Sequence, residues 1–229
     1  NGEETIKPKI QHLLDDFYRV KETPVTKTCE AMDRHGSNKN HRQHVIYCPF
    51  YDALFKDLSV IGLLEFGIGS QNNAFAFTMG GQPCKPGGSL RAWQELFPDA
   101  QIFGADIDKD VLFQEDKITT YFVDAFDFKS ISDMWKTIHT DFTEQKIQII
   151  VDDAHHTLAA NLNFLHYSLK HLEPNGWYVI EDINRDIGSH IDGIKEYLAN
   201  NKNDAVFLDI PNDTNQTNNC LAIIHKTSS

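Results

Sequence analysis

The sequence is short of basic residues, and this shortage excludes one large class of partner. Its 229 residues contain 21 Lys and Arg against 33 Asp and Glu, so the formal net charge is −12. A chain with this charge is repelled by the phosphate backbone of DNA or RNA unless a local basic patch overrides the repulsion. We therefore expect no nucleic-acid partner.

Long apolar runs and closely spaced cysteine pairs are also missing. No apolar stretch approaches the roughly 20 residues of a membrane-spanning helix, and the amino terminus lacks the basic and then apolar layout of a signal peptide. We expect a soluble protein in a reducing cytoplasm, with no membrane partner. The four cysteines form no C-x-x-C pair, which suggests neither a zinc site nor a redox motif: Cys29, Cys48, Cys84 and Cys220.

The length suits a single α/β domain over residues 1–229, because no break in composition marks a second unit. Residues 1–58 are expected to supply an amino-terminal helix and a loop that covers the ligand site. Residues 59–229 would then form the core. The helix carries an apolar stripe formed by Ile6, Ile10, Leu13, Leu14 and Phe17. This stripe could pack on the domain's own surface, form a contact in a homo-oligomer or act as a lid.

Apolar runs alternate with helical spacings from residue 60 onward. Strands are predicted at 60–66, 101–105, 118–123, 147–151, 176–180, 205–210 and 220–225. Helical segments separate the first five, as in a parallel sheet, and the last two can form a hairpin. The predicted fold class is α/β, a doubly wound Rossmann-like sheet of seven strands, mostly parallel with an antiparallel hairpin at the carboxyl-terminal edge.

Two polar stretches lack such a pattern. Residues 24–47 are expected to be either disordered or a functional loop. Residues 71–88 contain four glycines and two prolines, which predicts an inserted loop before a helix that begins at Ser89.

Acidic and imidazole side chains follow two adjacent predicted strands. The carboxyl ends of parallel strands meet at one edge of a sheet, where ligands bind in open α/β folds. Several carboxylates at such an edge repel one another unless a cation or a proton relay offsets their charge. The residues that converge are Asp152, Asp153, His155 and His156 after one strand, and Glu181 and Asp182 after the other.

Carboxylate oxygens suit Mg²⁺ or Mn²⁺. A hydroxyl is a poor nucleophile near pH 7, so such an ion and a nearby base would together favour chemistry at a hydroxyl. His156 lies three residues after Asp153, close enough to take a proton there. Alternatively, the acids cap helices and His156 is a surface residue, or His156 or His155 is itself a metal ligand.

A glycine loop follows the first predicted strand. Gly67 and Gly69 would let the backbone turn and approach a ligand closely. An NAD-binding fingerprint would have a third glycine where Asn72 stands. Asp106 ends the next strand, where a carboxylate can accept both ribose hydroxyls or cap a short helix. Asp124 ends the third strand, where it would lie beside an adenine.

In this order, and over nearly the whole chain, these motifs resemble the class I S-adenosylmethionine-dependent methyltransferases. A narrower set is similar to the metal-dependent sugar O-methyltransferases of the mycinamicin and rhamnosyl type. Asn38 stands here for the family's acid, and Ala154-His155 for its Gly-Ser. The motifs read Gly36-Ser37-Asn38-Lys39 with His44 and Tyr47, Gly87-Gly88-Ser89-Leu90-Arg91-Ala92-Trp93, Asp152-Asp153-Ala154-His155-His156 and Tyr178-Val179-Ile180-Glu181-Asp182.

The resemblance implies that S-adenosylmethionine is the cofactor and that Mg²⁺, or Mn²⁺, is held by Asp153, Glu181 and Asp182. It also implies that His156 is the general base and that Asp153 takes part in catalysis. The implied cofactor-binding residues are Ser37, Tyr47, Glu65, Gly67, Gly69, Ser70, Arg91, Asp106, Ile107, Asp124, Ala125, Phe126 and Asp152.

The predicted function is an S-adenosylmethionine- and divalent-metal-dependent O-methyltransferase. Its expected acceptor is a hydroxyl of a sugar, or of a glycosylated or natural-product small molecule. Two alternatives belong to other classes. One is an NAD-linked oxidoreductase of related fold, and the other is a module that binds the cofactor product or a sugar without catalysis.

Overall fold

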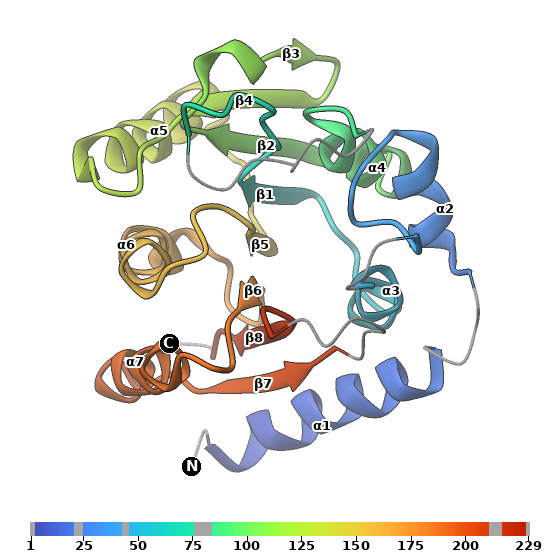
Figure 1. Cartoon of the computed structure of the whole chain (residues 1–229), viewed down its shortest axis with the longest axis vertical. Helices are drawn as coiled ribbons and strands as arrows, with labels where there is room; N and C mark the ends of the chain where they lie inside the picture. The colour runs from blue at the N-terminus through green and yellow to red at the C-terminus, as the bar shows by residue number, and fades with distance from the viewer. Residues whose placement is uncertain (1–2, 21–24, 43–45, 76–83, 211–216, 228–229) are drawn as a thin grey trace.

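The computed structural model describes residues 3–20, 25–42, 46–75, 84–210 and 217–227. Its centre is one sheet of eight strands, in the order β3-β4-β2-β1-β5-β6-β8-β7 (Figure 1). The strands are β1 (Gly62–Phe66), β2 (Gln101–Asp106), β3 (Gln114–Glu115), β4 (Ile118–Phe122), β5 (Ile149–Asp152), β6 (Trp177–Ile183), β7 (Ala205–Asp209) and β8 (Cys220–His225). The helices are α1 (Glu3–Val20), α2 (Lys27–Arg34), α3 (Cys48–Phe55), α4 (Gly88–Leu96), α5 (Phe128–Asp141), α6 (Leu158–Ser168) and α7 (Gly188–Asn200), with short 3-10 turns η1 (Lys109–Val111) and η2 (Leu169–His171).

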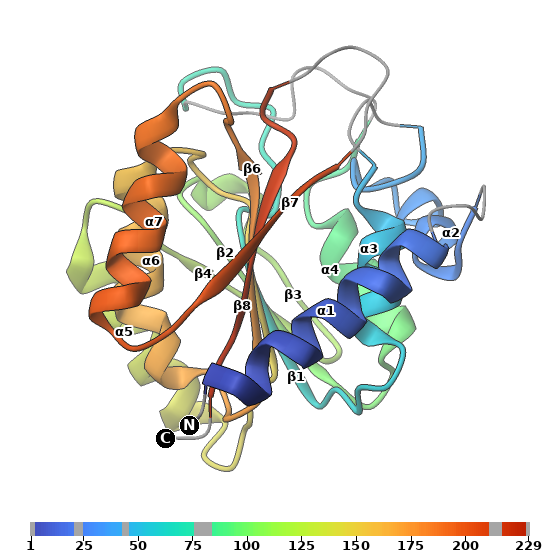
Figure 2. The same cartoon turned by 90° about the horizontal axis from the view of Figure 1, so that it is seen from below.

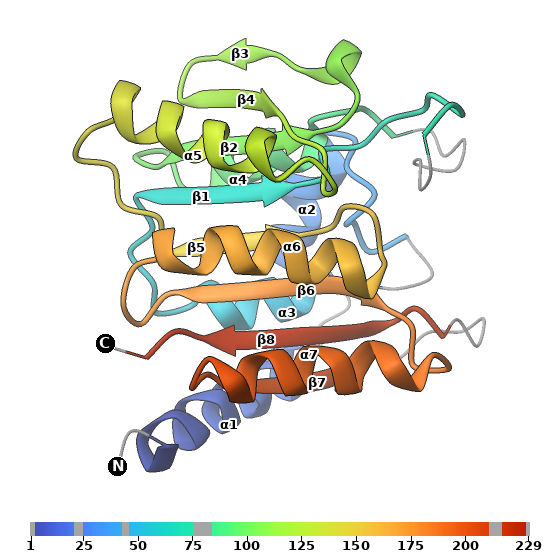
Figure 3. The same ribbon diagram turned by 90° about the vertical axis from the view of Figure 1, so that its left-hand side faces the viewer.

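The sheet is parallel in its middle and antiparallel at both edges. β4, β2, β1, β5 and β6 run in the same direction, whereas β8 runs against β6 and β7 (Figure 3). The predicted fold class, with its carboxyl-terminal hairpin, is confirmed. The predicted count of seven strands is wrong, because β3 adds an eighth strand beside β4. β3 has two residues, both exposed, which is too short for a periodic pattern in the sequence.

Helices cover both faces of the sheet. α1 to α4 lie on one face, and α5 to α7 lie on the other (Figures 1 and 3). Within each strand, side chains alternate between the two faces. Leu63 and Val179 pack toward α1 to α4, whereas Leu64 and Ile180 pack toward α5 to α7. This alternation also decides which face each acidic side chain of a strand reaches.

α1 packs against the rest of the chain through the apolar stripe expected from the sequence (Figure 2). Ile10, Leu13 and Phe17 are buried, and the Phe17 ring meets the Phe50 ring of α3 edge to face. Of the three roles considered for this stripe, packing on the chain's own surface is the one that the structure shows. Neither α1 nor any other helix among the described residues is long and apolar enough to cross a membrane.

The stretch at 24–47 is more ordered than the sequence predicts. It contains α2, which the Thr26 side chain caps by accepting a hydrogen bond from the Cys29 amide. With eight residues, α2 is too short for its periodicity to separate it from a loop. The helix predicted to start at Ser89 begins one residue earlier, after Gly87. His44 and residues 76–83 lie outside the described residues.

A disulfide between Cys29 and Cys48 joins α2 to α3. The two cysteines are 19 residues apart and fully buried, so no spacing motif reveals the pair. The loop that the bond closes carries Ser37, Lys39 and Tyr47. Disulfides persist mainly in oxidising compartments, and the prediction of a reducing cytoplasm did not anticipate this bond.

Replacing both disulfide cysteines by alanine should lower the free energy of unfolding by about 2–4 kcal/mol, because the unfolded chain regains the freedom of the closed loop. Urea unfolding measures this loss. Cys220→Ala is the control, since Cys220 is equally buried but is a free thiol. Dithiothreitol should destabilise the wild type and leave Cys29→Ala/Cys48→Ala unchanged. Equal effects of the reductant on both proteins would contradict the bond.

Candidate active site

A cavity of about 500 Å³ opens at the carboxyl ends of the parallel strands. The segments that follow β1, β2, β4 and β5 line it, together with the end of β6. This is the edge at which open α/β sheets bind ligands. The lining includes nine of the residues predicted to bind the cofactor: Ser37, Gly67, Gly69, Ser70, Asp106, Ile107, Asp124, Ala125 and Phe126.

Gly67 brings the end of β1 against the end of β5. It has a positive φ of 81°, and a Cβ at this position would lie 2.3 Å from the Asp153 carbonyl oxygen. A residue with a side chain could not approach so closely without moving the backbone. The glycine loop therefore lies directly beside Asp153.

Asp106 is held beside the cavity by backbone hydrogen bonds. Its two carboxylate oxygens accept from the amides of Ile68 and Asp108, at 2.9 Å each. Burial raises the pKa of Asp106, and these amide donors oppose the rise. Each oxygen keeps a second lone pair that can accept a ligand hydroxyl. Asp124 is held in a similar way, by the amide of Phe126.

Asp152 is one of the predicted cofactor residues that the structure does not bring to the cavity. It lies on the face covered by α5 to α7, because side chains two apart in β5 share a face and Ile150 packs there. It is fully buried and accepts hydrogen bonds from the Asn161 side chain and the Ala154 amide. Burial raises the pKa of Asp152 to about 6. The others that do not line the cavity are Tyr47, Glu65 and Arg91.

Arg91 is engaged elsewhere, although it stands in a motif shared with the family. Its guanidinium pairs with Glu115 and lies over the Phe113 ring. It thereby connects α4 to the edge strand β3. Nothing in these contacts directs Arg91 toward a ligand in the cavity.

Asp153, His156 and Asp182 come together in the cavity wall. One ligand atom of each lies within 4.8 Å of the other two, and His156 Nε2 is 3.7 Å from a carboxylate oxygen of Asp182. Two carboxylates suit Mg²⁺ or Mn²⁺, and an imidazole beside them can serve as a base or as a further ligand. The donors present therefore fit the divalent cation that the sequence predicts.

The backbone is unusual at two members of this group. His156 and Asp182 have left-handed conformations, with φ of 53° and 57°. Such values are uncommon outside glycine and concentrate at functional sites. β6 is irregular at the same point, because its register with β8 shifts between Ile180 and Ile183. This irregularity accounts for Asp182 reaching the cavity wall.

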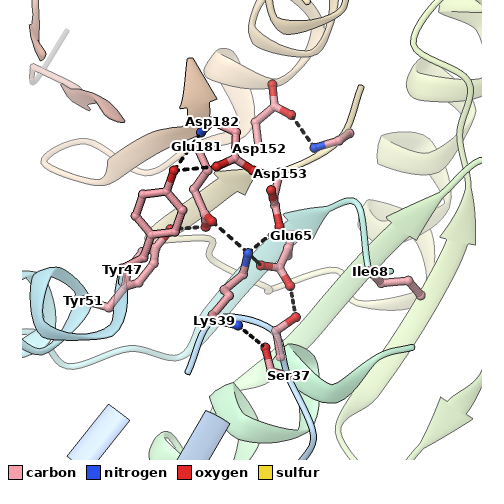
Figure 4. Close-up of polar contacts among 12 residues, drawn as sticks. Ser37, Lys39, Tyr47, Tyr51, Glu65, Ile68, Asp152, Asp153, Glu181 and Asp182 are labelled. Carbon is pink, nitrogen blue, oxygen red and sulfur yellow. Dashed lines mark hydrogen bonds and ion pairs between the residues drawn. The ribbon is translucent and has the colours of Figure 1, made fainter. Parts of the chain in front are cut away.

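Lys39 does not line the cavity but lies among three carboxylates next to it (Figure 4). Its ammonium nitrogen is 2.5 Å from Asp153, 3.0 Å from Glu181 and 3.5 Å from Glu65. Lys39 and both glutamates are almost fully buried. The glutamates reach it because Leu63 of β1 and Val179 of β6, each two residues earlier in its strand, face α1 to α4.

The charges of this group depend on one another. Burial alone would lower the pKa of Lys39, but attraction by Asp153, Glu181 and Glu65 outweighs burial, so this pKa lies well above its ordinary value. Burial raises the pKa of Glu181 well above its usual range and that of Asp182 to about 6, and repulsion by Asp153 adds to both rises. A further cation close to these carboxylates would therefore stabilise their charged forms.

Two tyrosines of the amino-terminal segment bind the acids at the end of β6. The Tyr47 hydroxyl donates to Asp182 at 2.5 Å and accepts from its amide at 3.2 Å. The Tyr51 hydroxyl donates to Glu181 at 2.5 Å, and Lys39 holds the second oxygen of that carboxylate (Figure 4). Of the three predicted metal ligands, Asp153 and Asp182 line the cavity, whereas Glu181 faces Lys39 and Tyr51.

Sequence reasoning missed three members of this arrangement, namely Lys39, Tyr51 and Ser89, whose hydroxyl donates to Glu65. A signal for Lys39 was present. The two-residue period of β1 and β6 puts Glu65 and Glu181 on the same face, and two buried carboxylates on one face require a cation nearby. Lys39 is the one basic residue of the motif at residues 36–39.

Tyr51→Phe should lower the free energy of unfolding by about 1–3 kcal/mol, because a buried carboxylate oxygen of Glu181 loses its hydrogen-bond donor. Chemical denaturation measures the change. Tyr178→Phe is a matched control, since the Tyr178 hydroxyl is buried and has no hydrogen-bond partner among the described residues. Its removal should cost nothing. Equal losses in both variants would contradict the importance of the Tyr51 bond.

Comparisons with known proteins agree with this geometry. No protein-family model matches the chain. It is 30% identical over 152 residues to 8-demethyl-8-alpha-L-rhamnosyl tetracenomycin-C 2'-O-methyltransferase of Streptomyces olivaceus, covering 66% of this chain and 36% of that protein. It is 30% identical over 139 residues to mycinamicin VI 2''-O-methyltransferase of Micromonospora griseorubida, covering 60% and 31%. The chain spans about a third of the length of these curated relatives.

A solved structure extends the likeness to the fold. The MycE methyltransferase from the mycinamycin biosynthetic pathway, in complex with Mg and SAH, superposes with a TM-score of 0.65 and 25% identity. The match covers 89% of this chain and 55% of that one. The resemblance predicted from the motifs is thus confirmed. The chain has the Rossmann-like fold of the class I S-adenosylmethionine-dependent methyltransferases and is similar in sequence to their sugar O-methyltransferases.

Proposed function

We propose that the protein is an S-adenosylmethionine- and divalent-metal-dependent methyltransferase that acts on a hydroxyl of a sugar, as part of a glycosylated natural product. The observation that carries this proposal is the convergence of Asp153, His156 and Asp182 in the wall of the cavity beside the glycine loop. The relatives whose names describe transfer of a methyl group to sugar hydroxyls support the same reaction class.

The cofactor would occupy the part of the cavity lined by the ends of β1, β2 and β4. Asp106 keeps acceptor capacity for the ribose hydroxyls, in addition to its two backbone donors. Asp124 and Phe126 line the same cavity at the end of β4, where they suit an adenine. The loop of Gly67 and Gly69 lets the ligand approach the backbone closely.

Asp153 and Asp182 would hold the divalent ion, and Glu181 directly precedes Asp182 in the chain. Their carboxylates lie where the cavity meets the buried group around Lys39. A bound Mg²⁺ or Mn²⁺ would lower the pKa of the acceptor hydroxyl. The partial burial of these carboxylates, which are 15% and 22% exposed, strengthens their attraction for such an ion, because nearby charges are screened less than in water.

His156 would take the proton of the acceptor hydroxyl. Its ring belongs to the same group as Asp153 and Asp182, and Asp182 can stabilise the imidazolium that forms. S-adenosylmethionine, when bound, would supply the methyl group to the acceptor oxygen and would leave as the thioether S-adenosylhomocysteine.

The cofactor assignment predicts different effects for two aspartates. Asp106→Asn should weaken binding of S-adenosylhomocysteine by about 10–100-fold, because the amide loses a charged acceptor. Asp152→Asn should leave this affinity within about threefold, because Asp152 lies away from the cavity. Titration calorimetry distinguishes the two. Tight binding of NAD, with no response to S-adenosylhomocysteine, would overturn the assignment in favour of an oxidoreductase.

Asp153 and His156 should also differ in their effects. Asp153→Asn should weaken both Mn²⁺ and acceptor binding, because a neutral amide attracts a cation less. His156→Ala should keep Mn²⁺ affinity while methyl transfer to a panel of glycosides slows by the roughly 10²–10⁴-fold typical of a lost general base.

His139→Ala is the control for these variants, because His139 is an exposed residue of α5. Loss of Mn²⁺ binding in His156→Ala would make this residue a ligand instead of the base. Full activity of the wild type in excess chelator would contradict the proposed requirement for a divalent metal. Cofactor binding without transfer to any hydroxyl would favour a non-catalytic module.

A further inference from the structure

Lys39 makes the most deeply buried ion pairs in the described part of the chain. Its side chain is 3% exposed, and its partners Glu65, Glu181 and Asp153 are 0%, 1% and 15% exposed. Burying a charged ammonium is costly unless its partners are fixed in good geometry. A lysine placed here therefore needs a reason beyond general stability.

The backbone holds Lys39 in this place. The Lys39 amide donates to the Ser37 hydroxyl at 3.1 Å, and the Asn40 side-chain amide donates to the Ser37 carbonyl at 2.8 Å. The Lys85 amide also donates to the Gly36 carbonyl at 2.8 Å. Hydrogen bonds thus hold residues 36–40 to one another and to the segment before α4. The Lys39 side chain extends from this fixed backbone toward the sheet.

Asp153 belongs to two groups at once. Its Oδ2 accepts from Lys39 at 2.5 Å, and Asp153 also forms the cavity-facing set with His156 and Asp182. Lys39 itself does not line the cavity. The ammonium therefore contacts Asp153 away from the place that a ligand of the cavity would occupy.

We propose that Lys39 is a positioning residue of the cation site, which holds Asp153 and Glu181 together so that Asp153 presents its other oxygen to a divalent ion. This inference rests on the cation site of the proposed function. Without the ammonium, Asp153, Glu181 and Glu65 would repel one another and turn apart. The Asp153 carboxylate, which also lines the cavity, would then lose the orientation that a divalent ion needs.

The test compares Mn²⁺ affinity, by calorimetry or by electron paramagnetic resonance, in the wild type, Lys39→Met, Lys39→Arg and Lys129→Met. Lys39→Met should bind Mn²⁺ about 10–100-fold more weakly, as is typical when a group that orients a metal ligand is lost. Lys39→Arg keeps the charge and should recover part of the affinity. Lys129→Met removes a lysine whose side chain is 80% exposed and should bind like the wild type.

Binding of S-adenosylhomocysteine is measured on the same samples and shows whether the cavity is intact. Lys39→Met should keep this affinity within about threefold of the wild type. Parallel loss of both ligands would reduce Lys39 to a structural role and overturn the proposal. Unchanged or tighter Mn²⁺ binding in Lys39→Met would overturn it too. So would an Mn²⁺ affinity of Lys39→Arg that is no higher than that of Lys39→Met, or a wild type that binds no Mn²⁺.

The proposal and the proposed function fail in different ways. A wild type that binds Mn²⁺ and S-adenosylhomocysteine but transfers no methyl group would contradict the proposed function. It would not contradict the role of Lys39 at the cation site. Weak Mn²⁺ binding confined to Lys39→Met, in an enzyme that methylates a glycoside, would support both.

Discussion

Mutual repulsion among carboxylates is the constraint on which the site depends. Asp153, Glu181 and Glu65 approach one ammonium in the buried interior, and Asp182 lies beside them. Their charges cannot share this space in a low-dielectric interior without cations or protons. Lys39 supplies one positive charge from within the chain. The remaining negative charge faces the cavity through Asp153 and Asp182, which is what makes that wall a place for a divalent ion.

The amino-terminal segment is therefore part of the site, although the sheet carries its acids. Lys39 reaches Glu65 of β1, Glu181 of β6 and Asp153, which directly follows β5. Tyr47 and Tyr51 each bind one acid of β6. The disulfide between Cys29 and Cys48 closes the loop that contains Lys39 and Tyr47. α3 follows this loop directly and packs under α1 through its aromatic side chains. Stability of the segment and geometry of the acids are thus linked.

The sequence predicted the sheet and the edge that holds the site, because β-branched runs ending in acids and glycines identify buried parallel strands and their carboxyl ends. It did not predict how those acids divide between two faces. Asp152 and Asp153 are neighbours in sequence, yet one is bound to Asn161 beneath α6 and the other lies in the cavity wall. The two-residue period of β1 and β6 indicates a cation near Glu65 and Glu181, but it does not identify the residue that supplies it. The disulfide has no local pattern, since it joins two segments through tertiary packing. Asp182 depends on a bulge that periodicity does not show.

The most direct measurement is an anomalous diffraction map of crystals grown with Mn²⁺ and S-adenosylhomocysteine. We predict one manganese peak in contact with Asp153 and Asp182, next to His156, with the Lys39 ammonium still bound to the other oxygen of Asp153. We also predict the thioether of S-adenosylhomocysteine in the adjoining cavity. A cofactor bound there with no manganese among these side chains, or a manganese ion in the place of the Lys39 ammonium, would contradict this arrangement of the site.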